Sequence, residues 1–303
     1  MLKTRRWLRR SGFHLLKITA RLSALGGPAW LRAIGENLGA VHFRLGRDRR
    51  RRLLNHMAEL MPERSKEGRL PADLRQAYRI NDRAILEILA AYSGALQPGQ
   101  VASMCALENL QVLDQALAAG RGVVLLGMHM GNGVALAIHL AQRGYPVSVV
   151  YRESNKISPE FFARGIARQG LDAIAALPAA AGFRRMLRAL RQGRIVFILM
   201  DQASKTGGVA ARFLGKDLDM PPGPAELGRR TGAPLIPLLL SGVDGVWSFR
   251  LGAPIQLDGS RPIEEQVKML CEMMEAHILQ HPQWWTWHQR RWHRHPLSPS
   301  ICH

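Results

Sequence analysis

The stretch GVVLLGMHMGNGV, residues 122–134, decides how this chain folds and where its chemistry is expected. It begins with a continuous apolar run that includes β-branched residues, which is typical of a strand buried on both faces of a parallel sheet. His129 follows, and Gly131 and Gly133 then lead into an apolar segment with helical spacing. The stretch therefore predicts a strand, a short polar loop and a helix, with an imidazole just beyond the carboxyl end of the strand.

The same alternation of short apolar runs and helical segments continues toward the C-terminus. Strands are predicted at 122–127, 147–151, 173–176, 195–200, 235–240 and 246–251. Helices are predicted at 134–142, 159–170, 182–192, 224–231 and 263–280, and earlier in the chain at 47–61, 75–96 and 107–119. This order predicts an α/β fold: a mainly parallel sheet covered by helices on both faces, with an N-terminal helical cap.

Charge is the unusual feature of the composition. The 303 residues include 42 Lys and Arg against 23 Asp and Glu, which gives a formal net charge of +19. Such a field attracts anionic lipid, an acidic carrier protein or nucleic acid, but no nucleic-acid recognition motif accompanies the charge. The three cysteines are scattered, and no Cys/His spacing indicates a metal site, so we predict a reduced protein without a metal.

The N-terminal segment 1–34 combines basic residues with apolar ones. No run approaches 18 apolar residues, so a membrane-spanning helix is not predicted. An interfacial helix fits better, basic on one face and apolar on the other, with Trp7 and Trp30 on the apolar face. The alternative is an amphipathic helix that packs on its own domain. We therefore predict a membrane-contacting segment at 1–34 and a single α/β domain at 35–303.

In a parallel sheet, functional side chains gather beyond the carboxyl ends of the strands. His129 stands at such an end, and imidazole is the usual group that takes a proton from a hydroxyl or amine near neutral pH. Asp201 ends another strand and could orient His129, bind an amine or only order its loop. Arg152 ends a third strand and suits a phosphate. Arg168, on the following helix, is a candidate for extending this basic surface.

Five blocks of sequence resemble the lipid A late acyltransferase family, within the lysophospholipid acyltransferase superfamily. They are GMHMGNGVALA (127–137), VVYRESN (149–155), VFILMDQASKTGGVAARFLGK (196–216), PPGPAELGRRTGAPLIPLLL (221–240) and HPQWWTWHQRRWH (281–293). The resemblance implies an enzyme at the cytoplasmic face of a bacterial inner membrane. It would transfer an acyl group from a thioester of acyl carrier protein or coenzyme A to a lipid acceptor, without a metal or redox cofactor.

The resemblance also assigns roles to individual residues. His129 matches the histidine of the family's His-x4-Asp/Glu motif, which deprotonates the acceptor, and Arg152 matches an arginine linked to substrate binding. The remaining matches are Asn132 in the same motif, Asp201 and Gln202 as the family's Asp-Gln pair, and Phe213 and Gly215 as the following Phe-Gly turn. Asn132, Gln202, Phe213 and Gly215 are taken as substrate-binding candidates. The Trp-rich block near the C-terminus suits contact with lipid headgroups or a structural cluster.

The motif departs from the family at one position. Its acid should stand five residues after His129, where this chain has Val134. Three explanations remain: another carboxylate, Asp201 or Glu153, reaches His129; the acceptor is an amine or another good nucleophile; or the protein has lost catalysis. The leading hypothesis is an acyltransferase with a non-standard acid, and the alternative is a catalytically silent homologue that binds lipid or acyl carrier.

Overall fold

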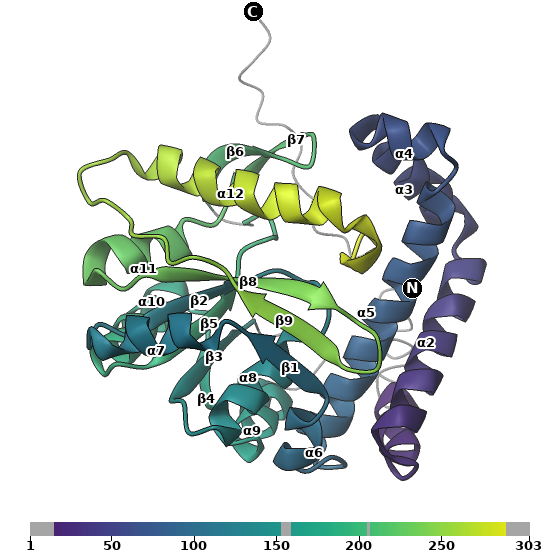
Figure 1. Cartoon of the computed structure of the whole chain (residues 1–303), viewed down its shortest axis with the longest axis horizontal. Helices are drawn as coiled ribbons and strands as arrows, with labels where there is room; N and C mark the ends of the chain where they lie inside the picture. Colours follow the sequence, from purple (N-terminus) through teal and green to yellow (C-terminus); the bar gives the residue numbers. More distant parts are fainter. Residues whose placement is uncertain (1–14, 153–158, 205–206, 289–303) are drawn as a thin grey trace, which may run out of the picture.

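A seven-stranded sheet with the strand order β1-β9-β8-β2-β5-β3-β4 forms the centre of the molecule (Figure 1). The computed structural model describes residues 15–152, 159–204 and 207–288. The strands are β1 Cys105–Glu108, β2 Val123–Gly127, β3 Val147–Tyr151, β4 Asp172–Ala175, β5 Ile195–Leu199, β8 Leu235–Gly242 and β9 Trp247–Leu251. Among neighbouring strands of this sheet, β8 and β9 are antiparallel and all other neighbours are parallel. The predicted mainly parallel sheet is confirmed.

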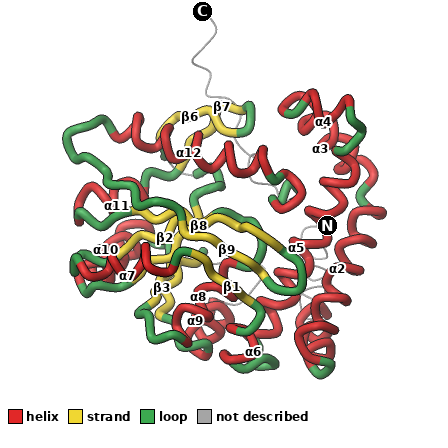
Figure 2. Tube along the Cα trace, in the orientation of Figure 1, coloured by secondary structure: helices red, strands yellow, loops and turns green. Residues whose placement is uncertain are grey.

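Helices surround this sheet, as the red tubes around the yellow strands show (Figure 2). In both views α12 lies on one side of the sheet and α8 and α9 lie on the other. The helices that follow β2 are α8 Gly133–Gln142, α9 Pro159–Arg168, α10 Ala179–Arg191, α11 Gly223–Thr231 and α12 Ile263–Gln280, and a 3-10 turn, η1, covers Pro282–Trp284. Apolar residues of α8 and α12 are buried against the sheet, which explains the helical spacing in their sequences.

The N-terminal helices form the predicted cap, which lies beside the sheet at the ends of its strands (Figure 1). They are α2 Gly27–Leu45, α3 Arg47–Leu60, α4 Pro62–Lys66, α5 Leu70–Tyr92 and α6 Pro98–Ala102. The longest two, α2 and α5, pack closely because α2 presents Gly35 and Gly39 to the α5 backbone. A Cβ atom on Gly35 would lie 2.5 Å from the Cα atom of Arg83, so a larger residue would push the helices apart.

Several elements differ from the sequence prediction, among them α5, which was predicted at 75–96 and covers Leu70–Tyr92. The helix predicted at 107–119 is shorter: Leu107 belongs to β1, and α7 Leu110–Ala118 begins after Asn109, which has a left-handed φ of 61°. A hairpin of β6 Val209–Phe213 and β7 Lys216–Met220 was not predicted. Both strands are short and only partly buried, so their apolar pattern is weak.

Candidate active site

His129 and Asp201 meet because their strands are neighbours in register. Gly127, the last residue of β2, pairs with Leu199, the last residue of β5. His129 and Asp201 each follow two residues later, so the two residues lie side by side beyond the carboxyl ends of β2 and β5. The Nδ1 atom of His129 is 2.6 Å from Oδ1 of Asp201. The backbone N–H of His129 donates to Oδ2 of the same carboxylate at 2.9 Å.

This contact fixes which nitrogen of His129 carries the proton in the neutral ring. A carboxylate only accepts hydrogen bonds, so Nδ1 is the donor and the lone pair is left on Nε2. The side chain of Asp201 is fully buried, whereas that of His129 is 29% exposed. The pair therefore has its carboxylate inside the protein and its imidazole on a partly exposed side chain.

The C-terminal segment completes the surroundings of Asp201. Trp285 donates its indole N–H to Oδ2 of Asp201 at 2.8 Å and forms an isolated β-bridge with Met130, beside His129. Its ring is fully buried, edge-on to Phe213 at a centroid distance of 6.5 Å and to Trp287 at 4.9 Å. The segment 285–287 thus packs against the loop that carries His129, and its buried rings are part of the core rather than a headgroup contact.

Asn132 connects the same loop to α8. Its Oδ1 atom accepts from the backbone N–H of Ala135 at 3.0 Å and caps the helix, while Nδ2 donates to Glu87 of α5 at 3.0 Å. Between His129 and Asn132, Gly131 has a φ of 63°, and a Cβ atom there would lie 2.9 Å from Leu240. Only glycine fits this left-handed turn under a packed strand.

A family model described as bacterial lipid A biosynthesis acyltransferase matches residues 1–294. The chain belongs to this family. It is 29% identical to the phosphatidylinositol mannoside acyltransferase of Mycobacterium tuberculosis over 191 residues, which cover 61% of this chain and 59% of that protein. The protein of the same name from Mycolicibacterium smegmatis is 26% identical over 240 residues, 74% of this chain and 75% of that protein. The chain thus spans about three fifths of the length of the M. tuberculosis relative that it matches.

Val134 is the position at which this chain departs from the motif of the lipid A acyltransferase family. It lies in the first turn of α8 and packs, half-buried, against the core. The carboxylate that bonds to the ring of His129 is that of Asp201, which follows the neighbouring strand β5. Glu153, the other carboxylate considered from the sequence, lies outside the described residues.

The other predicted site residues differ in their burial and in their contacts. Gln202 follows Asp201 directly and is partly exposed, and Arg152 is exposed at the end of β3. Phe213 is buried and contacts Trp285, while Gly215 completes the β6–β7 turn with a φ of 73°. The guanidinium of Arg168 donates to the carbonyl of Tyr92 at the end of α5, so the structure does not bring it to His129. Their substrate-binding roles stay predictions.

Two residues of this site were missed in the sequence. Trp285 lay in a recognised Trp-rich block, but nothing in the block indicated that its indole would bond to Asp201. Glu87 stands on the apolar face of an amphipathic helix, four residues after Arg83. Two opposite charges at this spacing, on a helix face that is mostly apolar, were a detectable sign of a buried polar network.

Proposed function

We propose that this protein transfers an acyl group from a carrier-bound thioester to a hydroxyl or amine of a lipid, with His129 as the general base. Asp201 serves as the acid in place of the one that the family's motif has and that this chain lacks at position 134. The observation that carries the proposal is the 2.6 Å contact between Nδ1 of His129 and the buried carboxylate of Asp201. This arrangement holds the ring in the tautomer that a base needs and stabilises the ring when it becomes protonated.

The reaction follows from that tautomer. Nε2 of His129 takes the proton of the acceptor O–H or N–H as the acceptor atom forms a bond to the thioester carbonyl carbon. The tetrahedral intermediate then collapses, the C–S bond breaks, and the leaving thiolate takes the proton back from Nε2. The products are an ester or amide and a free thiol, and His129 and Asp201 return to their starting states.

The relatives suggest the class of acceptor. Their names describe acyltransferases that act on phosphatidylinositol mannosides, which combine sugar hydroxyls with a phospholipid. We propose a glycolipid or other lipid acceptor for this chain and an acyl carrier protein or coenzyme A thioester as donor, with no metal or redox cofactor. Arg152 is exposed just after β3, at the same end of the parallel strands as His129, and this position suits a phosphate group of either substrate.

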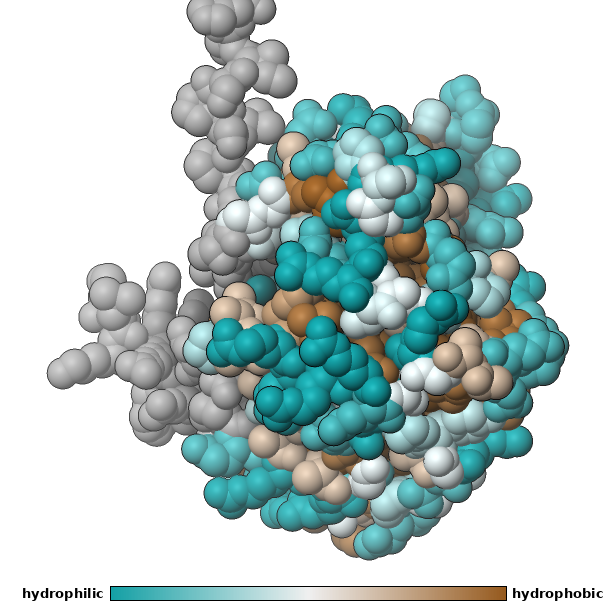
Figure 3. Space-filling model, turned by 90° about the vertical axis from the view of Figure 1, so that its left-hand side faces the viewer, coloured by the Kyte–Doolittle hydropathy of each residue, from teal (hydrophilic) through white to brown (hydrophobic). Residues whose placement is uncertain are grey.

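An acidic carrier protein would suit the charge of the chain. On the side of the molecule that carries α10 and α11, the surface is mostly hydrophilic, with small hydrophobic areas between (Figure 3). The exposed arginines of α10 are Arg184, Arg185, Arg188 and Arg191. Together with the net charge of +19, they favour association with an anionic partner.

An anionic membrane surface is the second partner that we propose, at the cytoplasmic face of a bacterial inner membrane. Residues 15–25 and the start of α2 expose a row of large apolar side chains, of which Leu25 is 85% exposed. The row consists of Leu15, Ile18, Leu22, Leu25 and Trp30. The opposite face packs into the core through Ala20 and Leu31. Among the described residues no helix is both long and apolar enough to cross a bilayer. Trp7 lies outside the described residues.

The test compares the wild-type protein with His129→Ala, using radiolabelled acyl thioesters of acyl carrier protein and coenzyme A together with host membranes. We expect labelled lipid from the wild type and none above background from the variant. His139→Ala is the matched control, because the ring of His139 bonds to the carbonyl of Ala102 at the end of α6 and not to Asp201. Equal labelling by wild type and His129→Ala would support the alternative, a silent homologue that holds its ligand without reacting it.

A further inference from the structure

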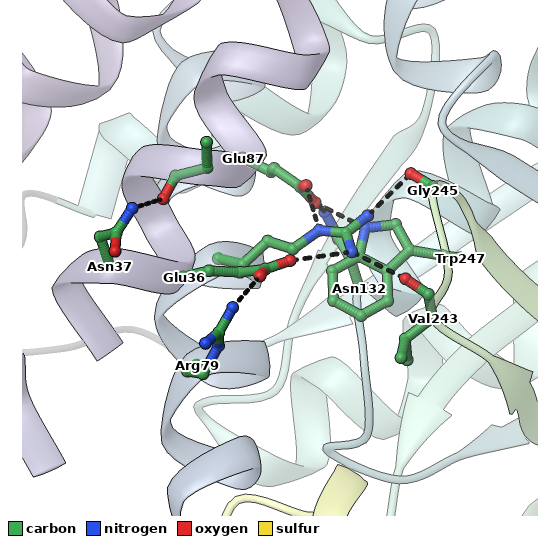
Figure 4. A network of polar contacts seen from close by, with 10 residues as sticks. Glu36, Asn37, Arg79, Glu87, Asn132, Val243, Gly245 and Trp247 are labelled. Atoms are coloured by element: carbon green, nitrogen blue, oxygen red, sulfur yellow. Dashed lines mark hydrogen bonds and ion pairs between the residues drawn. The ribbon is translucent and has the colours of Figure 1, made fainter. Parts of the chain in front are cut away.

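Glu87 is a buried carboxylate that the proposed reaction does not use directly. It lies on α5, in the helical cap, and its side chain is 1% exposed. Its Oε1 atom accepts from Nε of Arg83 at 2.8 Å, and its Oε2 atom accepts from Nδ2 of Asn132 at 3.0 Å and from the indole N–H of Trp247 at 2.6 Å (Figure 4). Three donors from three parts of the chain therefore converge on one carboxylate.

The charge of Glu87 is compensated inside the protein. The guanidinium of Arg83 is stacked over the ring of Trp247, 3.9 Å from its centroid, and donates to the carbonyl of Val243 at 3.0 Å. Burial raises the pKa of Glu87, and the charge of Arg83 opposes that rise. A buried ion pair is maintained only when its remaining polar atoms are also bonded, and this pair meets that condition. The network is consequently rigid rather than loosely solvated.

Asn132 transmits this rigidity to the loop of His129. Its amide has one possible orientation, because Oδ1 must accept from Ala135 and Nδ2 must donate to Glu87. Trp247, held by the same carboxylate, also lies where a Cβ atom on Gly131 would come within 3.0 Å of its ring. The segment from His129 to Asn132 is thus held at its first residue by Asp201 and at its last by Glu87.

We propose that Glu87 is a positioning residue of this site: through Asn132 it holds the His129 loop at the angle at which Nε2 meets the acceptor. The inference rests on the proposed function, because it assigns Glu87 a part in the same reaction. Glu87 does not contact the reacting atoms. A displacement of about 1 Å in a reacting group can lower a rate by about a hundredfold, so a distant anchor can control the rate.

Asn132→Asp tests the link with little change in shape. The new side chain still caps α8, but its second oxygen would face the Glu87 carboxylate. We expect kcat to fall by about ten- to a hundredfold, with KM for both substrates within about twofold of wild type. Glu36→Gln is the matched control, because Glu36 pairs with Arg79 and Arg83 of the same network but does not touch Asn132. It should leave kcat within about twofold, since no part of the loop is displaced.

The double variant Glu87→Gln with Asn132→Asp separates positioning from mere stability. It reverses the polarity of the pair, so that the glutamine amide donates to the aspartate while its oxygen still accepts from Arg83. Because that amide would also face the indole N–H of Trp247, the single and the double variant are both compared in a Trp247→Phe background, which lacks this donor. The proposal is supported if the second substitution reverses at least half of the decrease in log kcat that Asn132→Asp causes. If Asn132→Asp keeps its kcat, or if the folded double variant is as slow as the single one, the proposal is wrong.

A second readout does not depend on turnover. The Nδ1 proton of His129, bonded to Asp201, should give a downfield proton NMR resonance that disappears in His129→Ala. We expect it to shift or broaden in Asn132→Asp and to return in the double variant. A wild-type protein without His129-dependent transfer would overturn the proposed function. An unmoved resonance in folded Asn132→Asp would overturn the role of Glu87 alone.

Discussion

Asp201→Asn is the substitution that best isolates the chemistry of the site, because it changes almost nothing in shape. Oδ2 of Asp201 accepts from the backbone of His129 and from Trp285, and Oδ1 accepts from the ring of His129. An asparagine keeps the bonds from the His129 backbone and from Trp285 when its oxygen takes the place of Oδ2. Its NH2 group then faces Nδ1 of His129 and must donate to it.

The ring responds by moving its proton to Nε2, which removes the lone pair that the acceptor needs. The equivalent change in the triad of a serine protease lowers the rate by about four powers of ten. At about 1.4 kcal/mol for each power of ten, this is about 5.5 kcal/mol of transition-state stabilisation. Folding should lose much less, on the order of 1 kcal/mol, because each polar atom still has a partner.

The assay is steady-state acyl transfer from the preferred thioester, with urea unfolding of the same preparations. The expected result is a fall in kcat by three to four powers of ten, without a matching fall in stability. Gln202→Ala is the neighbouring control and should leave the tautomer of His129 unchanged. If Asp201→Asn keeps more than a tenth of the wild-type kcat, the carboxylate does not set the tautomer, and the role assigned to Asp201 is wrong.

Three further predictions concern other parts of the molecule. Trp285→Phe removes the N–H bonded to Asp201 but keeps a ring beside Phe213; steady-state kinetics should show a kcat lower by about tenfold, and urea unfolding a loss of about 1 kcal/mol. Burial lowers the pKa of His277 to about 4 from 6.5, so the unfolded chain binds the extra proton first and stability falls as the pH drops through this window. Urea unfolding should therefore show that the free energy of unfolding falls less between pH 7.5 and pH 5 in His277→Gln than in wild type, by about 2 kcal/mol. Leu22→Asp with Leu25→Asp should weaken sedimentation with anionic phospholipid vesicles by more than about tenfold, while Met269→Asp on α12 should not; equal binding by both variants would exclude the proposed membrane row.

Much of the fold could be predicted because its strands are continuous apolar runs. The five residues of β2 are all buried, and β3 was predicted with the bounds that the structure gives. Strand β1 was missed because it is a short strand at the edge of the sheet, where only Cys105 is buried. The pairing of strands could not be predicted, because order and register depend on packing between distant segments.

The same limit applies to the site. The sequence indicated His129 and Asp201 separately, as polar residues that end buried strands, and left Asp201 as one of two candidate carboxylates. Their contact follows from the register between Gly127 and Leu199, which no local pattern encodes. The bonds of Trp285 and Glu87 depend on a C-terminal segment and a helical cap that fold back over the sheet from opposite ends of the chain.

The position of the acid changes what the structure must hold rigid. An acid in the family's motif would stand five residues after the histidine, in the same local segment of the chain. In this chain that position is Val134, and the carboxylate that bonds to the His129 ring is that of Asp201, which follows β5, so the contact depends on the register of β2 and β5. The far end of the loop then needs an anchor of its own. Glu87 provides it through Asn132, and each of the two carboxylates also accepts an indole N–H, from Trp247 and Trp285 respectively. Loss of the acid from the helix is therefore consistent with an active site, provided that both anchors of the loop are intact.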